Sequence, residues 1–427
     1  MDERSLRGLL RQALDAEPPL GPVARNALRA GIRLRWRRRA QGATACAAVI
    51  AAAVVAVPTL TGATHGRPAL GGHSALPQGH SAPPPRFVYV VDQNPGKPGM
   101  VTPIRLATNK PGPSIPVGKS PLDIAVTPDG KTAYVSNDSS PGTVTPITTA
   151  TGQAGAPIKI GPIAAMMAIT PNGKTGYVVT GGAQSKPGAV RVVDLATNKP
   201  GKLIKASYIP VAVAVAPDGR TAYVANYGTS LVTPINVATG TPGPPIRVGR
   251  APCAFAFAKD GRTAYVVSQI AGTVTPVNTA TNRPGKPIKV GKLPTVIAVT
   301  PDGSTAYVLN DGGNTVTPIN TATNRPGTPI KVGNGPVSIA FTPDGRTAYV
   351  VNAIGNTVTP INTATKRPGT PIKVGNDPRA IVITPDGKTA YVANQNSGTV
   401  TPINTATNRP GGPIRVGKLP QALALVP

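Results

Sequence analysis

The sequence predicts an all-β protein, an eight-bladed β-propeller with four short antiparallel strands per blade, preceded by a helical head and one transmembrane helix. Three observations lead to this prediction. A unit of about 42 residues recurs from residue 87 onward, Gly (48) and Pro (51) fall at fixed places in it, and a run of 25 uncharged residues follows an arginine cluster near the N-terminus. Only 4% of the residues are aromatic, so the core must be built mainly from aliphatic side chains.

Two markers define the repeat. The first is a Tyr-Val pair that occurs eight times, with 42 residues between successive pairs in the last four intervals. The second is a Pro-Asp-Gly turn, in which Pro fixes φ, Asp caps the turn and Gly takes a positive φ; we expect these aspartates to be turn formers. The marker tyrosines are Tyr89, Tyr134, Tyr177, Tyr223, Tyr265, Tyr307, Tyr349 and Tyr391.

The unit around Tyr307 shows the four predicted strands. Strand-like pieces cover residues 296–300, 305–310, 314–321 and 329–332, with turns between them. Four short strands in such a unit are typical of a propeller blade. No unit contains a helical pattern, which excludes a helical solenoid.

The ends of the chain predict how the ring closes. The first tyrosine strand, residues 87–91, has no inner strand before it, whereas the chain ends with an unpaired inner strand at residues 422–426. Pairing these two strands hides an open sheet edge and gives eight blades. Seven blades are the alternative, if the divergent unit around Tyr177 does not pack as a blade.

Each third strand breaks a rule of sheet formation, because it contains a proline. Pro is normally confined to edge strands or bulges. We therefore expect an interrupted ladder, with a bulge or bend, at Pro146, Pro234, Pro276, Pro318, Pro360 and Pro402.

The N-terminal part predicts a membrane anchor. Residues 1–41 read as a cytoplasmic basic helical head, with ten Arg against four acidic residues. Residues 42–62 read as a transmembrane helix or uncleaved signal anchor, since the arginines before them favour a cytoplasmic N-terminal side. Residues 63–86 form a Pro/Gly-rich linker, and the propeller covers residues 87–427. The expected localisation is a single-pass cell membrane protein with an extracellular propeller; cleavage and secretion is the alternative.

The last complete unit carries a family resemblance. It reads Pro385-Asp386-Gly387-Lys388-Thr389-Ala390-Tyr391-Val392-Ala393-Asn394, then Gly398-Thr399-Val400, then residues 403–408 with Ile-Asn-Thr-Ala-Thr-Asn. These residues resemble the YVTN-type β-propeller repeat of bacterial and archaeal surface proteins, and the resemblance covers about residues 87–427. It implies a secreted or surface-attached propeller and little about activity. The family usually has Asp where this chain has Asn236, Asn278, Asn320, Asn362 and Asn404.

The chemistry available in the propeller is narrow. From residue 86 onward there is no His, Glu or Trp. This absence predicts that the protein is not an enzyme and has no cofactor or metal, and that it acts as a protein- or polymer-binding scaffold; a secreted propeller-type hydrolase or lyase is the alternative. Cys253 reads as a small apolar residue of an inner strand. Basic residues at the blade edges fit an anionic cell-envelope polymer or a protein as partner, with a monomeric state expected. No nucleic acid is expected, because stacking aromatics are missing.

A candidate binding site follows from positions where the repeat becomes polar. Just after the Pro that opens each inner strand, most blades have small or apolar residues, but three adjacent blades do not. We predict that these polar residues form a patch at one mouth of the central channel. They are Asp123, Arg379 and Gln421, together with Asp377, which lies just before the Pro of its blade.

Overall fold

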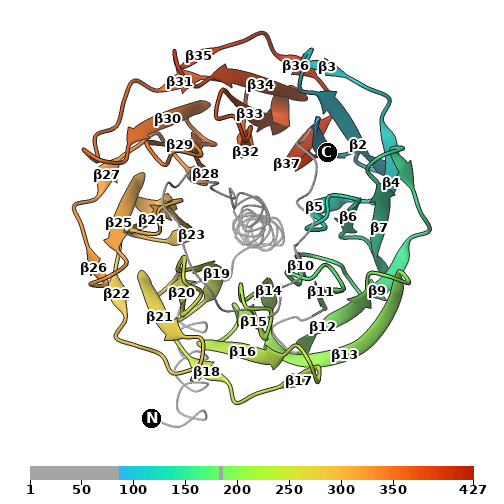
Figure 1. Cartoon of the computed structure of the whole chain (residues 1–427), viewed down its shortest axis with the longest axis vertical. Helices are drawn as coiled ribbons and strands as arrows, with labels where there is room; N and C mark the ends of the chain where they lie inside the picture. Colours follow the sequence, from blue (N-terminus) through green and yellow to red (C-terminus); the bar gives the residue numbers. More distant parts are fainter. Residues whose placement is uncertain (1–85, 182–185) are drawn as a thin grey trace, which may run out of the picture. The chain divides into compact units, whose positions relative to one another are not determined.

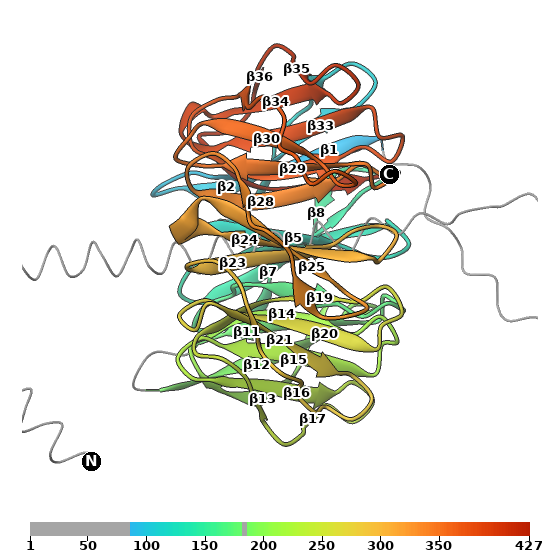
Figure 2. The same ribbon diagram turned by 90° about the vertical axis from the view of Figure 1, so that its left-hand side faces the viewer.

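The computed structural model describes residues 86–181 and 186–427, which lie in one compact unit. These residues form eight antiparallel sheets arranged in a ring (Figure 1), so the eight-bladed propeller is confirmed and the seven-bladed alternative is wrong. Seen from the side, the sheets of successive blades lie face to face (Figure 2).

Each blade runs from an inner strand outward. Blade 1 consists of β37 (Leu419–Val426), β1 (Phe87–Gln93), β2 (Pro98–Arg105), β3 (Lys110–Pro111) and β4 (Ile115–Lys119), and blade 2 of β5 (Pro121–Val126), β6 (Thr132–Asn137), β7 (Gly142–Thr148), β8 (Gln153–Ala154) and β9 (Ile158–Gly161). Blade 3 consists of β10 (Met167–Ile169), β11 (Thr175–Thr180), β12 (Pro187–Asp194) and β13 (Lys199–Tyr208). Blade 4 consists of β14 (Pro210–Val215), β15 (Thr221–Asn226), β16 (Leu231–Asn236), β17 (Thr241–Pro242) and β18 (Ile246–Arg247). Blade 5 consists of β19 (Pro252–Phe257), β20 (Thr263–Ser268), β21 (Thr273–Asn278) and β22 (Ile288–Lys289), and blade 6 of β23 (Pro294–Val299), β24 (Thr305–Asn310), β25 (Thr315–Asn320), β26 (Arg325–Pro326) and β27 (Ile330–Lys331). Blade 7 consists of β28 (Pro336–Phe341), β29 (Thr347–Asn352), β30 (Thr357–Asn362) and β31 (Ile372–Lys373). Blade 8 consists of β32 (Pro378–Ile383), β33 (Thr389–Asn394), β34 (Thr399–Asn404), β35 (Arg409–Pro410) and β36 (Ile414–Arg415).

The ring closes as predicted, between the last strand and the first. β37 pairs antiparallel with β1, with Tyr89 opposite Ala424, and Arg86 N donates to Val426 O at 2.7 Å. The closing strand is longer than expected, and its register shifts between Val91 and Asp92. One blade is therefore built from both ends of the propeller sequence, which removes a free sheet edge.

The turns between the first and second strands confirm the role of the repeated aspartate. In blade 7, the Thr342 hydroxyl donates to Asp344 Oδ1 at 2.6 Å, and Arg346 N donates to the same oxygen at 3.0 Å. Gly345 follows with φ +70°, a left-handed conformation that favours Gly. Asp344 is thus a local cap that sets the turn.

The proline in the third strand interrupts only the outer side of that strand. In blade 6, the register between β24 and β25 runs through Pro318 without a shift, opposite Tyr307. The Pro318 carbonyl accepts a bond from Gly327 on the outer side, the side on which its missing N–H would also point. The outer strand is accordingly split into β26 and β27. Blade 3 has Val192 at this place, and its outer strand β13 is a single element.

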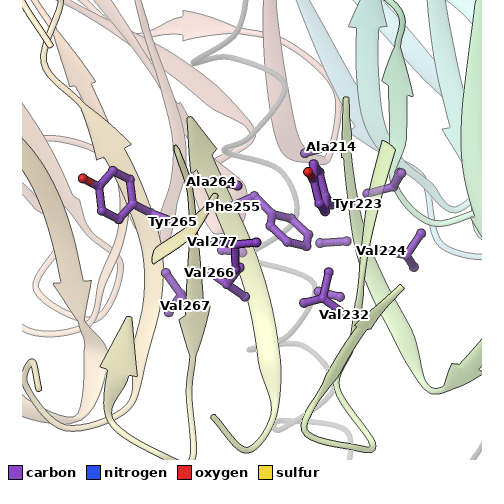
Figure 3. Close-up of a cluster of buried hydrophobic side chains, with 14 of the residues drawn as sticks. Ala214, Tyr223, Val224, Val232, Phe255, Ala264, Tyr265, Val266, Val267 and Val277 are labelled. Atoms are coloured by element: carbon purple, nitrogen blue, oxygen red, sulfur yellow. The ribbon is translucent and has the colours of Figure 1, made fainter. Parts of the chain in front are cut away.

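The blades pack against one another through the marker tyrosines. Tyr223 of blade 4 lies against Phe255 of blade 5, with ring centroids 6.4 Å apart, among Val and Ala side chains (Figure 3). The Tyr223 hydroxyl then donates to Asn282 Oδ1 of blade 5 at 2.7 Å. Asn282 has φ +56°, and Asn is one of the few residues that accept this conformation. The same bond links blade 8 to blade 1 across the closure, from Tyr391 to Asn109.

The predicted helical head and transmembrane helix require a correction. Apart from strands, the described residues contain only two 3₁₀ helices of three residues each, η1 (Asp311–Gly313) and η2 (Gln395–Ser397). Three residues rise roughly 6 Å, against about 30 Å of bilayer core. No helix within residues 86–181 and 186–427 is long and apolar enough to span a membrane. The fold class is corrected to an all-β propeller, and the described residues contain no membrane-spanning helix for the expected single-pass localisation. The predicted head (1–41), anchor (42–62) and most of the linker (63–86) lie outside the described residues.

Candidate functional site

One mouth of the ring collects two sets of loops. Strands alternate in direction within each blade, so the loop from the second to the third strand and the loop that enters the next inner strand emerge at the same end. The Pro-Asp-Gly turns lie at the opposite end. The predicted site residues Asp377 and Arg379 belong to the first mouth, just before and within β32.

Arg379 is held in place by two neighbours on blade 8. Its Nη2 lies 2.9 Å from Asp377 Oδ2, and its Nε donates to Gln395 Oε1 at 3.2 Å. Both members of the ion pair are largely buried, with side chains 29% and 19% exposed for Arg379 and Asp377. Among the described residues, these bonds engage two of the five N–H donors of the guanidinium. The other three N–H donors take no part in these two bonds.

Asp311 places a carboxyl group at the same mouth from another blade. It opens η1 in blade 6, and its backbone N donates to Leu293 O at 3.1 Å. Burial raises the pKa of Asp311, and the positive charge of Arg379 pulls it back down. Blade 7 lies between the two and contributes the small, buried Ala353 at the position of Asp311. The site thus spans blades 6 to 8.

The predicted patch is only partly brought together. Asp377 and Arg379 form an ion pair, while the half-buried Gln421 lies on β37 of the neighbouring blade 1. Asp123 is 2% exposed and faces blade 3, where its Oδ2 accepts a bond from Met167 N at 3.3 Å. Burial raises the pKa of Asp123 to about 7. Asp123 therefore belongs to the interface of blades 2 and 3.

Two site residues were missed in the sequence, Asp311 and Gln395. Both directly follow the last residue of a second strand, a position that the repeat leaves variable. At the same position of the repeat, four residues after the marker tyrosine, six of the eight blades have a polar or aromatic side chain that can hydrogen-bond: Gln93, Asp138, Tyr227, Gln269, Asp311 and Gln395. In the sequence, the residue that ends the second strand is nearly constant between repeats, whereas the residue after it varies. This contrast could have identified Asp311 and Gln395 as candidate site residues.

Two other features of the described residues, a groove and a cysteine, are further candidates for a site. A shallow groove between blades 2 and 3 is lined by Lys159 and Arg191, but the Arg191 guanidinium donates to Ile160 O and Gly201 O at 2.9 and 3.0 Å. Cys253 is fully buried on β19, as expected for a small apolar residue.

The arrangement at the mouth has the parts needed for attack on a carbonyl group. A carboxylate with a raised pKa is a better base for water. A positioned guanidinium can stabilise an oxyanion. Neither task needs His, Glu or Trp, the residues whose absence argued against an enzyme.

Comparisons with known proteins support a propeller fold, and part of the chain matches the model of an enzyme family. Residues 241–410 match the family described as "Lactonase, 7-bladed beta-propeller". No curated protein matches the sequence. The matched segment contains Asp311, Asp377, Arg379 and Gln395, although the ring has eight blades rather than seven.

Several solved structures share the fold. Hydrazine synthase from Kuenenia stuttgartiensis is 24% identical, with a TM-score of 0.55 over 67% of this chain and 96% of that chain. Dihydro-heme d1 dehydrogenase NirN is 17% identical, with a TM-score of 0.70 over 82% and 78%. A functionally unknown protein from Desulfotomaculum acetoxidans is 19% identical, with a TM-score of 0.57 over 80% and 99%.

These findings correct one prediction. The expectation that the protein is not an enzyme is overturned by the match to a family described by an enzyme activity. The absence of His, Glu and Trp was too narrow a criterion, because Asp and Arg can supply a base and an oxyanion donor. Structure and comparisons together show that the chain is a β-propeller protein.

Proposed function

We propose that the protein is a propeller-type hydrolase that opens cyclic esters at this mouth. The observation that carries the proposal is the Arg379 guanidinium, which Asp377 and Gln395 anchor at the mouth. The half-buried Asp311 carboxyl group lies at the same mouth, on blade 6. The lactonase match over the segment that holds both residues supports it. This reading was the alternative from the sequence, and the comparisons favour it over a pure scaffold.

The proposed reaction uses water as nucleophile. The Asp311 carboxylate accepts a proton from water as the water oxygen bonds to the ring carbonyl carbon. The carbonyl oxygen becomes an oxyanion, which the other N–H donors of Arg379 stabilise. The ring C–O bond then breaks, and the leaving ring oxygen takes the proton from Asp311, which gives an open hydroxy acid. Asp377 and Gln395 act as positioning residues, because they hold the guanidinium.

The experiment is acid release from γ-butyrolactone and δ-valerolactone in a pH-stat, with the full-length protein and its Arg379→Gln variant. The wild type should open at least one ring, and the variant should lose roughly 100- to 1,000-fold in kcat, as removal of an oxyanion donor does. Acid release that never exceeds the protein-free rate would overturn the proposal and leave the binding scaffold.

Two further assignments are proposed for the propeller: the type of its repeat, and an anionic binding partner. The recurring Tyr-Val pair and strand-ending Asn support a YVTN-type repeat within the propeller class. Exposed cations recur on the outer strands, and residues 86–427 carry 33 Lys and Arg against 12 Asp, which supports an anionic polymer or acidic protein as partner. The edge cations are Lys289, Lys331, Lys373 and Arg415. Salt-sensitive co-sedimentation with polyglutamate tests this; no binding at low salt would contradict it.

A further inference from the structure

Large apolar side chains are exposed on three consecutive blades at the same mouth. Ile270 of blade 5, Leu293 of blade 6 and Ile354 of blade 7 are 52%, 47% and 76% exposed. Ile270 and Ile354 each lie in the loop from the second to the third strand, and Leu293 lies in the loop that enters β23. Among the described residues, the other exposed large apolar side chains are Leu203 at 53% and Tyr208 at 40%, both on β13. Tyr208 ends β13 at the same mouth, where its carbonyl accepts a bond from Gly228 N.

These three side chains, termed here the apolar rim, adjoin the proposed site. The Leu293 carbonyl accepts the backbone bond from Asp311, and its side chain lies against Gly312, where an added Cβ would meet Leu293 Cδ1 at 3.1 Å. Ile354 directly follows Ala353, the small residue between Asp311 and Arg379, and its side chain lies over the backbone of Gly335. The rim is therefore continuous with the groups proposed to act on the ester.

The repeat shows that the fold does not require these residues. The position of Ile270 and Ile354 is Asn94, Ser139, Gly228, Gly312 or Asn396 in other described blades. Where blade 6 has Gly312, Leu293 supplies the apolar side chain instead, from the neighbouring loop. Leu293 does so with φ +49°, a conformation that L-residues with large side chains rarely adopt. Blade 8 has the polar pair Asn396 and Asp377 at the two positions.

We infer that the substrate is a lactone with an aliphatic substituent, whose ring lies between Asp311 and Arg379 and whose chain lies across the apolar rim. The inference rests on the proposed function and names its substrate class. An alkyl chain that covers Leu293 and Ile354 removes their apolar surface from water, which is the contribution that would select such a substrate.

The test is kcat/KM for a series of γ-lactones that carry alkyl chains of zero to eight carbons. The wild type should gain roughly two- to fourfold per methylene. Ile354→Ser and Leu293→Asn should flatten this slope, with each alkyl lactone compared to γ-butyrolactone in the same variant; Asn suits the left-handed backbone at residue 293. Leu203→Ser is the matched control, since Leu203 is 53% exposed on β13 of blade 3 and away from the mouth, and it should keep the wild-type slope.

The outcomes separate the two claims. Turnover of γ-butyrolactone without any gain from longer chains overturns the inference and leaves the proposed function intact. A slope that survives in Ile354→Ser and Leu293→Asn also overturns it. If no lactone is opened, the proposed function fails. Calorimetry with γ-alkyl lactams then tests whether the apolar rim binds alkyl chains. Equal affinity for lactams with short and long chains refutes that role of the rim.

Discussion

Replacement of the buried Asp92 by Asn should stabilise the ring in a pH-dependent way. Asp92 is the penultimate residue of β1, the second strand of blade 1; it is 1% exposed and accepts a bond from the Thr102 hydroxyl at 2.8 Å. Five other blades end this strand with Asn, and in blade 7 Asn352 Nδ2 donates to Thr359 Oγ1 at 2.9 Å. An amide can therefore fill this place without loss of the hydrogen bond.

The magnitude follows from the pKa of Asp92. Burial raises it from the ordinary 3.8 to about 7, against the opposing effect of the Thr102 hydroxyl bond. Between these two values the folded protein holds a proton that the unfolded chain has lost, so stability is fully present below pH 3.8 and decreases as pH rises through 7. A shift of this size corresponds to roughly 4 kcal/mol above pH 7. Asn does not titrate and escapes this cost.

The assay is urea unfolding of the full-length protein at pH 4.5 and pH 8. Asp92→Asn should gain about 2–4 kcal/mol of unfolding free energy at pH 8 and only about 1 kcal/mol at pH 4.5. Asp123, whose pKa burial also raises, is present in both proteins and cancels from the difference. The reverse change in blade 7, Asn352→Asp, should introduce the same pH dependence there. Equal stabilisation by Asp92→Asn at both pH values would refute the reasoning.

Three further predictions concern the mouth, the closure and the contacts between blades. First, kcat/KM for lactones should fall as pH falls through the pKa of Asp311, which burial places above the ordinary value for Asp, because only the ionised carboxylate accepts a proton; a profile flat down to pH 4 contradicts this. Second, deletion of residues 422–427 removes most of β37 and exposes β1, so the melting temperature should drop and light scattering should show aggregation; an unchanged melting curve would mean that the ring does not depend on this pairing. Third, Tyr265→Phe removes the bond to Asn324 Oδ1 at 2.9 Å and should cost about 1 kcal/mol in urea unfolding, whereas Tyr307→Phe, whose hydroxyl has a longer 3.4 Å bond to Thr363 O, should cost less.

The fold was largely predictable because the same strand and turn signals recur in each blade. The Tyr-Val pair and the Pro-Asp-Gly turn fix the strand order within a blade, and the unpaired strands at residues 87–91 and 422–426 fix the closure. The sequence did not predict that Pro318 interrupts only the outer side of β25. That result depends on whether its missing N–H would face the inner or the outer neighbouring strand. The Tyr223–Asn282 bond joins residues 59 apart, and only the ring brings them together.

The site was less predictable, for reasons of register and distance. Asp123 lies two residues after the Pro of its inner strand and Arg379 lies one residue after its own, and one residue along a strand reverses the direction of the side chain. Asp123 consequently faces blade 3, whereas Arg379 remains at the mouth. Asp311 and Arg379 lie at the same mouth on blades 6 and 8, and no linear spacing brings these two positions to one mouth.

The proposal that Asp311 is the base of a lactone hydrolase is tested most directly by comparing two aspartates at the same position of the repeat. Asp138 of blade 2 is the counterpart of Asp311, and burial raises the pKa of both, but only Asp311 lies within the influence of Arg379. In single-turnover hydrolysis of the best lactone substrate, Asp311→Asn should slow ring opening by 100-fold or more (on the order of a general base's contribution). Asp138→Asn should leave the rate unchanged. Equal rates for the two variants, or full activity in Asp311→Asn, would contradict the account.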